Sequence, residues 1–165
     1  MPTYFTDDNR PRGLTEPFPS NSPLLFLDFD GVLQTPAWAD WREMALCSEL
    51  EQLLRELPSL RVVVTSTHRE GRTLEGIRAM LPHAVAAKVV GTTPVQATGR
   101  ADGGRQIEIE TWLSAHPDVT QWVAVDDEAR LYTRGCAWLV QTSKYEGWDE
   151  LVTSQVRAAL GVRQR

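Results

Sequence analysis

The sequence predicts an α/β protein, with a doubly wound, Rossmann-like and mainly parallel sheet of about five strands and helices on both faces. Two observations lead to this fold class. Short apolar runs rich in valine and leucine alternate along the chain with stretches whose leucines recur at helical spacing, and such alternation indicates βαβ units. The chain has 165 residues, 42% of them hydrophobic, which suits one domain with a sizeable core.

The first half of the chain supplies the start of this pattern. The run 24–29 is apolar except for Asp28, as in a strand covered on both faces. Leucines at helical spacing predict a helix over 43–57, which Pro58 ends. Another apolar run predicts a strand over 60–64.

The second half repeats the alternation. We expect helices over 73–81, 104–115 and 148–160, because apolar residues recur there three or four positions apart. Asp102 is the expected N-cap of the second of these helices. Apolar runs predict the remaining strands, at 84–90, 119–125 and 137–140.

The N-terminal segment differs in composition from the rest. Residues 1–23 hold five of the ten prolines and show little periodicity, which predicts an irregular arm ahead of a single domain over 24–165. Phe5, Leu14 and Phe18 are the side chains expected to anchor this arm.

Charge and cysteine content exclude several classes of protein. Seventeen basic against 22 acidic residues give a net charge of −5, which argues against a whole-surface nucleic-acid binder but leaves a local basic patch open. Two cysteines are too few for a disulfide scaffold. No apolar run is long enough for a membrane span or a secretory signal. We therefore expect a soluble, cytoplasmic protein without a membrane partner.

Acidic residues follow two of the predicted strands. Asp28 and Asp30 end the first strand, and Asp126 and Asp127 follow the run that ends at Val125. Residues two apart in an extended chain point the same way, and ligands of open α/β sheets bind outside the carboxyl ends of the strands. Carboxylates gathered there need a cation, and oxygen ligands of this kind suit Mg²⁺.

Simpler explanations exist for each acidic pair. Asp-x-Asp-Gly also occurs in turns, and Asp-Asp after a strand is often a helix N-cap. A calcium loop starting at Asp28 would need Gly at its sixth position and Glu at its twelfth, where this sequence has Leu33 and Ala39. The placement of both pairs after apolar strands favours metal-assisted chemistry.

These residues resemble the motifs of the haloacid dehalogenase-like (HAD) phosphatase superfamily. The segment 28–33, Asp-Phe-Asp-Gly-Val-Leu, matches the first motif, and Asp126-Asp127 matches the fourth. Thr65 fits the second motif, with Ser66 beside it. The third motif is a Lys or Arg on the helix before the last motif, which Arg105 fits best, with two competitors, Lys88 and Arg100.

The resemblance implies a Mg²⁺-dependent phosphomonoester hydrolase. In this family Asp28 would be the nucleophile that forms an aspartyl-phosphate, and Asp30 the general acid and base. Asp28, the Asp30 backbone carbonyl and Asp126 would hold the metal, with Asp127 as an additional contact. Thr65, Ser66 and Arg105 would bind the phosphoryl group.

Chain length bears on the substrate. The segments where HAD enzymes insert a cap are short here, so the resemblance implies a minimal member without a large cap, open to a large substrate or to a cap from a partner protein. The phosphorylated substrate could be a small molecule or a nucleic-acid end. We expect His68 and Arg69 at the rim of the site as substrate contacts, where Arg69 could clamp a second phosphate. They resemble part of a Ser-Ser-Trp-Arg-like stretch in small HAD domains associated with RNA repair, and Trp38 could stack on a base.

Other classes remain as alternatives. A catalytically weak or inactive HAD-fold binding domain would share the fold, but the motif aspartates are all present. A polynucleotide-end phosphatase in nucleic-acid repair is a narrower version of the same enzyme. A receiver-like phosphoacceptor domain is disfavoured, since no aspartate ends the 60–64 or 84–90 run.

Overall fold

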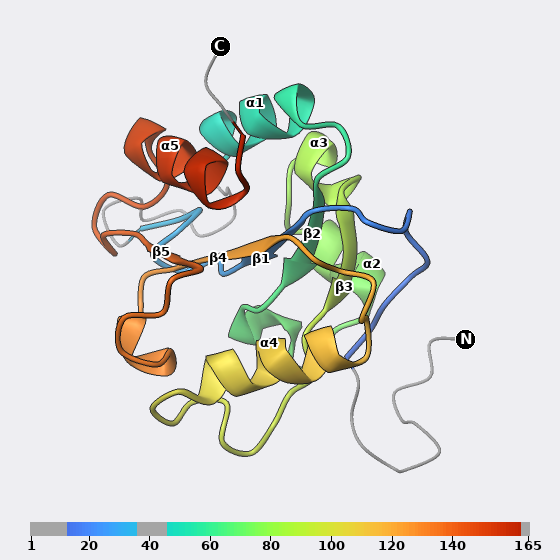
Figure 1. Cartoon of the computed structure of the whole chain (residues 1–165), viewed down its shortest axis with the longest axis vertical. Coiled ribbons are helices and arrows are strands. Elements are labelled where there is room, and N and C mark those ends of the chain that lie inside the picture. Colours follow the sequence, from blue (N-terminus) through green and yellow to red (C-terminus); the bar gives the residue numbers. More distant parts are fainter. Residues whose placement is uncertain (1–12, 36–45, 163–165) are drawn as a thin grey trace.

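A five-stranded, all-parallel sheet forms the centre of the computed structural model, which describes residues 13–35 and 46–162 (Figure 1). The strand order is β3-β2-β1-β4-β5, and the fold class predicted from the sequence is confirmed. The strands are β1 (Leu24–Leu27), β2 (Arg61–Val64), β3 (Val89–Thr92), β4 (Trp122–Asp126) and β5 (Leu139–Gln141).

Helices cover both faces of this sheet. In Figure 1, α1, α3 and α5 lie above the strands and α4 lies below them. None of the helices in the described ranges is long and apolar enough to span a membrane. The helices are α1 (Ser48–Glu56), α2 (Leu74–Arg78), α3 (His83–Ala86), α4 (Gly104–Ser114) and α5 (Glu150–Ala159), with short 3₁₀ turns η1 (Thr67–Arg69) and η2 (Ala129–Leu131).

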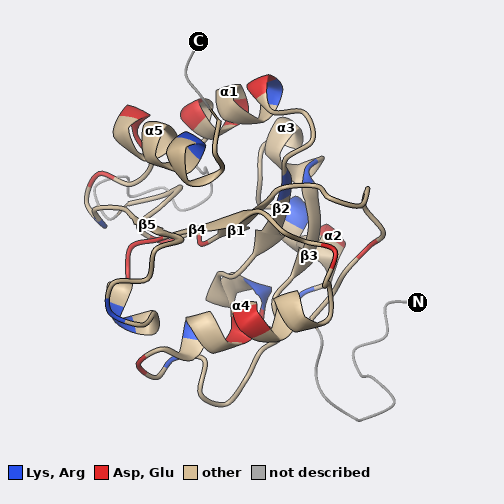
Figure 2. Ribbon diagram, in the orientation of Figure 1, with Lys and Arg blue, Asp and Glu red and all other residues tan. Residues whose placement is uncertain are grey.

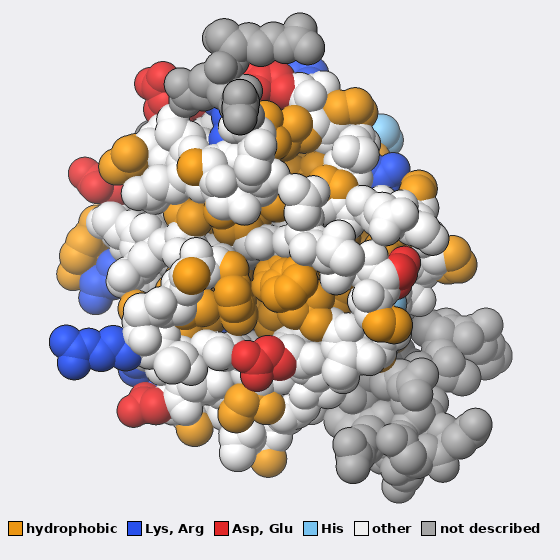
Figure 3. All heavy atoms as spheres, viewed as in Figure 1, with side chains coloured by type: hydrophobic (Ala, Val, Ile, Leu, Met, Phe, Trp, Pro, Cys, Tyr) orange, Lys and Arg blue, Asp and Glu red, His pale blue; other side chains and the backbone are white. Residues whose placement is uncertain are grey.

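The sheet separates two apolar cores. Leu25 and Leu27 of β1 pack on the side of α1 and α5, whereas Leu24 and Phe26 pack against α4, where Trp112 is also buried. Alternate side chains of a strand point to opposite faces, so a strand buried on both sides must be apolar throughout. Figure 2 shows charged residues mainly on helices and connections, and Figure 3 shows hydrophobic side chains between the two helix layers.

The prediction of a strand over 84–90 was wrong in its first half. Residues 83–86 form the helical turn α3, because the carbonyl of Pro82 accepts the N–H groups of Val85 and Ala86. An apolar run alone does not distinguish a short helix from a strand. The strand itself is shifted to 89–92, which brings the residues after it to the same sheet edge as the acidic pairs.

The predicted cap of α4 was also wrong. Gly103, with a φ of 73°, occupies the N-cap position, a left-handed backbone conformation that glycine adopts without strain. Asp102 instead pairs with Arg130, with its Oδ1 3.4 Å from Nη1. The remaining boundaries differ from the predictions by a few residues, and 43–45 of the first predicted helix lie outside the described residues.

The described part of the N-terminal segment, 13–23, lies against the domain. Leu14 is buried, Thr15 forms an antiparallel bridge with Gly91 at the edge of the sheet, and the ring of Phe18 stacks on Trp112. The segment therefore covers the outer edge of β3, which would otherwise expose unpaired backbone groups. Phe5 lies outside the described residues.

Candidate active site

Three neighbouring strands bring polar side chains to one level of the sheet. Leu27 of β1 pairs with Val64 of β2 on one side and with Val125 of β4 on the other. The next residue of each strand is therefore in register, and these residues are Asp28, Thr65 and Asp126. They lie at the carboxyl ends of the strands, beside the β1–β4 pair where the strand order reverses, which is the usual ligand position in such sheets.

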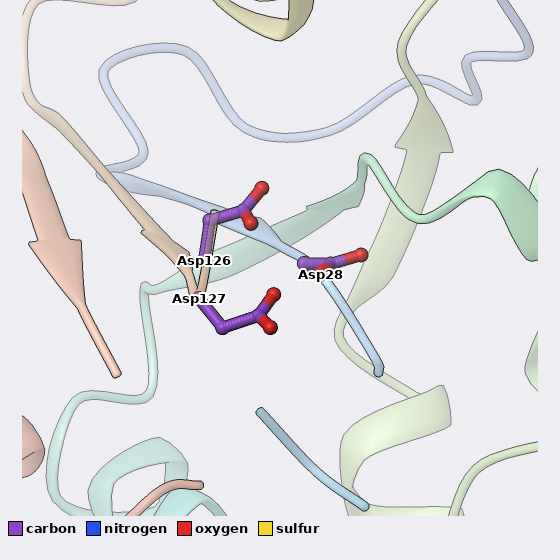
Figure 4. Close-up of side chains that lie close together, drawn as sticks. All are labelled: Asp28, Asp126 and Asp127. Carbon is purple, nitrogen blue, oxygen red and sulfur yellow. The ribbon is translucent and has the colours of Figure 1, made fainter. Parts of the chain in front are cut away.

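Three carboxylates converge at this edge. One oxygen of each of Asp28, Asp126 and Asp127 lies within 4.8 Å of the others, and Figure 4 shows the three side chains grouped at the ends of β1 and β4, with Asp126 and Asp127 extending toward the side on which Asp28 lies. Gly31 adopts a left-handed backbone conformation, with a φ of 75°, next to Asp127. A Cβ atom at position 31 would collide with the Asp127 carboxylate, so this cluster requires the glycine of the first motif.

Arg105 places a positive charge among these carboxylates. Its guanidinium comes from the first turn of α4, and Nη1 lies 3.2 Å from Asp28 Oδ1 and 2.8 Å from Asp126 Oδ2. The arginine is buried. Burial alone would lower the pKa of Arg105, but Asp126 and Asp28 outweigh that effect and raise it, so the group stays charged.

The two competing basic residues lie elsewhere. Arg100 is mostly exposed and pairs with Glu70 at 3.1 Å. Lys88 precedes β3, and its Nζ donates to the carbonyl of Pro58 at 2.6 Å. Of the three basic residues considered from the sequence, Arg105 is the one that the structure brings to the carboxylates.

The electrostatics of the cluster favour a cation. Burial, together with the charge of Asp126, raises the pKa of Asp28 to about 8, and burial with the same neighbour raises that of Asp127 to about 6. Burial also raises the pKa of Asp126. When all three carboxylates are ionised, Arg105 balances one negative charge and leaves two, which a divalent cation would neutralise.

Asp126 is held by further donors. Its Oδ2 accepts a hydrogen bond from the Tyr132 hydroxyl at 3.0 Å, and its Oδ1 accepts from the backbone N–H of Glu128 at 2.9 Å. Tyr132 is buried, and burial with the nearby Asp126 charge raises its pKa, so the phenol remains a donor. The sequence contained no signal for Tyr132, which belongs to no motif.

The two hydroxyl residues after β2 have different surroundings. Thr65 Oγ1 is buried and has no hydrogen-bond partner among the described residues, although an unpaired buried hydroxyl is costly. Ser66 Oγ instead accepts the N–H of His68 at 3.3 Å and caps η1. Thr65 therefore has a free hydroxyl beside Asp28, and Ser66 uses its own for local structure.

Arg69 points into the fold rather than onto the rim of the site. Its guanidinium is buried and forms an ion pair with Glu108 of α4 at 2.6 Å. Its remaining hydrogen bonds go to the backbone carbonyls of Thr65, Ser66, Thr93 and Pro94. The side chain thus joins the segments after β2 and β3 to α4, and its donors are not available to clamp a second phosphate.

Glu108 was missed in the sequence, although a signal existed. It follows Arg105 by three positions, as do residues on one face of a helix, and that face also carries the buried Ile109 and Trp112. A charged residue on an apolar helix face needs a partner, which in this protein is Arg69.

Asp30 and His68 meet at the exposed side of the site. Oδ2 of Asp30 lies 3.1 Å from Nε2 of His68, and Oδ1 accepts a hydrogen bond from Gln34. The Asp30 side chain is 60% exposed, and its carboxylate is not part of the three-carboxylate cluster. Trp38 lies outside the described residues.

A parallel α/β sheet whose central strands β1 and β4 end in carboxylates, with a basic residue from the helix that precedes β4, is the arrangement of a HAD-type hydrolase domain. The family model for the HAD domain in Swiss Army Knife RNA repair proteins matches residues 24–151, and the chain belongs to this family. The resemblance stated from the motifs is confirmed. Comparisons with curated proteins and with solved structures gave no match.

The buried ion pair between Arg69 and Glu108 should contribute strongly to the free energy of unfolding. Glu108→Ala leaves a buried guanidinium without its counter-charge, so we expect the free energy of unfolding to fall by about 3–5 kcal/mol. Urea denaturation measures this loss. Glu110→Ala, at an exposed position of the same helix, should change stability by less than about 0.5 kcal/mol. Equal effects of the two alanine variants would contradict the assignment.

The raised carboxyl pKa values predict a pH-dependent effect of Mg²⁺ on stability. Asp28 and Asp127 titrate at about 8 and about 6 in the folded protein, against about 3.9 for an aspartate in an unfolded chain. The folded state binds these protons more tightly, so without a cation its free energy of unfolding falls as the pH rises from about 4 to about 8. A cation favours the ionised carboxylates, so Mg²⁺ should raise the Tm more at about pH 8 than at about pH 5.

Differential scanning fluorimetry across this pH range, with and without MgCl₂, measures the effect. Asp28→Asn removes one ligand and one of the titrating groups, so its Mg²⁺-induced rise in Tm should be smaller at every pH. A rise that is independent of pH, or unchanged in the variant, would contradict a cation bound by these carboxylates.

Proposed function

We propose that this protein is a Mg²⁺-dependent phosphomonoester hydrolase that works through an aspartyl-phosphate on Asp28. The observation that carries the proposal is the alignment of Asp28, Thr65 and Asp126 at one level of the sheet, with Arg105 bridging the two carboxylates. Nucleophile, hydroxyl donor and positive charge then surround one position at which a phosphoryl group can bind. Membership of the HAD family supports this reading.

The carboxylate cluster fits a hard divalent cation. Each of the three residues offers one carboxylate oxygen, and these three oxygens lie within 4.8 Å of one another. Burial and the charge of Asp126 raise the pKa of Asp28 and of Asp127, and a bound cation would relieve the repulsion between these carboxylates. Asp28, Asp126 and Asp127 would hold Mg²⁺, with the backbone carbonyl of Asp30 as a further ligand. When bound, the cation lowers the repulsion between the phosphoryl oxygens and the attacking carboxylate.

In the first step, an oxygen of Asp28 attacks phosphorus as the bond from phosphorus to the ester oxygen breaks. Asp30 gives a proton to the departing oxygen, which leaves as an alcohol. Thr65 donates its hydroxyl to a phosphoryl oxygen, and Arg105 offers positive charge to the phosphoryl group while remaining paired with Asp126.

In the second step, water attacks the phosphorus of the aspartyl-phosphate and the bond to Asp28 breaks. Asp30, now a carboxylate, takes a proton from this water. The products are inorganic phosphate, a free Asp28 carboxylate and a protonated Asp30, so the enzyme returns to its starting state.

The proposed substrate is a phosphorylated nucleic-acid end. Between β2 and α4 the described chain holds only short elements and a loop, 65–103, without an inserted cap domain, and Asp30 is exposed to solvent. An open site of this kind accepts a terminal phosphate on a long molecule. The family takes its name from RNA repair proteins, which favours RNA among such substrates.

Replacing the nucleophile tests the reaction. Asp28→Asn should lower the Mg²⁺-dependent release of phosphate from p-nitrophenyl phosphate by about 10³-fold or more, because an amide cannot form the covalent intermediate. The matched control is Asp118→Asn, at an exposed position between α4 and β4, which should retain the wild-type rate. Full activity of Asp28→Asn would exclude this nucleophile, and an inactive wild-type protein would favour a binding domain.

A substrate panel tests the choice of nucleic-acid ends. Phosphate release should be fastest, in kcat/KM, for 3′- or 5′-phosphorylated RNA oligonucleotides, since they offer contacts beyond the terminal phosphate. The panel also contains the matching DNA oligonucleotides, mononucleotides, sugar phosphates and phosphopeptides, each with Mg²⁺ and with EDTA. A higher kcat/KM for a small phosphoester or a phosphopeptide would overturn the substrate assignment but not the reaction.

A further inference from the structure

His68 contacts the one proposed reacting group that the fold leaves exposed. Its Nε2 lies 3.1 Å from Asp30 Oδ2, and Gln34 donates to the other oxygen of the same carboxylate. An exposed aspartate otherwise samples several rotamers, and ordering it costs entropy. These two contacts therefore set the direction in which the 60% exposed Asp30 side chain points.

Several contacts hold the His68 imidazole that meets this carboxylate. The backbone N–H of His68 is bonded to the Ser66 hydroxyl, and its ring stacks on the ring of the buried Phe29, with centroids 6.0 Å apart. The next residue, Arg69, is anchored by its buried pair with Glu108. The His68 side chain is only 29% exposed. The contact between His68 and Asp30 therefore links a largely buried ring, packed on Phe29, to an exposed carboxylate.

We propose that His68 is a positioning residue for the proton transfers of Asp30, a role that rests on the phosphomonoesterase function proposed above. An ionised carboxylate only accepts hydrogen bonds, so Nε2 of His68 carries a hydrogen and donates it to Oδ2. Each carboxylate oxygen has a further lone pair. Asp30 can therefore lose its proton to the ester oxygen in the first step and regain one from water in the second while His68 holds its orientation.

Esters with different leaving groups separate this role from a general structural one. p-Nitrophenolate departs without a proton, whereas the alkoxide of glycerol 2-phosphate needs one, so the second ester depends more on a well-placed acid. His68→Phe keeps an aromatic ring against Phe29 but has no donor. It should lower kcat/KM for glycerol 2-phosphate about 10-fold or more, and for p-nitrophenyl phosphate less than about 3-fold.

Two further variants complete the experiment. His68→Gln retains an N–H donor and should recover most of the lost activity on glycerol 2-phosphate. His83→Phe is the matched control, since His83 is exposed at the start of α3, and it should leave both values of kcat/KM unchanged. If His68→Phe does not fold, His68→Ala gives the same comparison of the two esters.

The outcomes distinguish the proposed role of His68 from the proposed phosphatase function. Equal losses on the two esters, no loss on either, or no recovery with His68→Gln would overturn the role of His68 while leaving the phosphatase reaction in place. A wild-type protein that hydrolyses neither ester nor any member of the substrate panel would overturn the proposed function itself.

Discussion

The ion pairs of Arg105 are the interaction on which the candidate site depends. Asp28 and Asp126 lie side by side because their strands are paired in register, and both are buried. Two adjacent buried carboxylates repel each other strongly. The guanidinium lies within 3.2 Å of one and 2.8 Å of the other, which makes the arrangement tolerable, yet a single positive charge leaves the three-carboxylate cluster with a net negative charge. The remaining negative charge is what the proposed divalent cation would neutralise.

A second buried pair keeps the first in place. Arg105 reaches the carboxylates only while α4 keeps its position beside the sheet, and Glu108 ties that helix to Arg69. Arg69 in turn holds the backbone after β2, including the carbonyl of Thr65. The Arg105 charge that contacts Asp28 and the Thr65 hydroxyl beside Asp28 are therefore both held by buried polar contacts that meet at α4.

The motif residues were easier to locate from the sequence than the residues that hold them in position. Asp28 and Asp126 follow apolar runs, and parallel strands align their carboxyl ends, so the convergence of these aspartates was predictable. The contact of Tyr132 with Asp126 was not predictable, because it depends on the path of the chain through η2. The helix α3 was missed since a short apolar run fits a strand equally well, and the cap of α4 was misplaced because Gly103 lies next to a better side-chain capper, Asp102.

The sequence by itself determined the fold class and the three-carboxylate cluster of Asp28, Asp126 and Asp127. Both follow from local periodicity and from the geometry of parallel strands. The sequence favoured Arg105 over Arg100 and Lys88 as the basic residue beside the carboxylates, but all three carry a positive charge. Only the tertiary structure showed that Arg105 is the one in contact with Asp28 and Asp126. It also decided that Arg69 faces the interior and that His68 meets Asp30. Such choices depend on contacts between residues far apart in the chain, which local patterns do not encode.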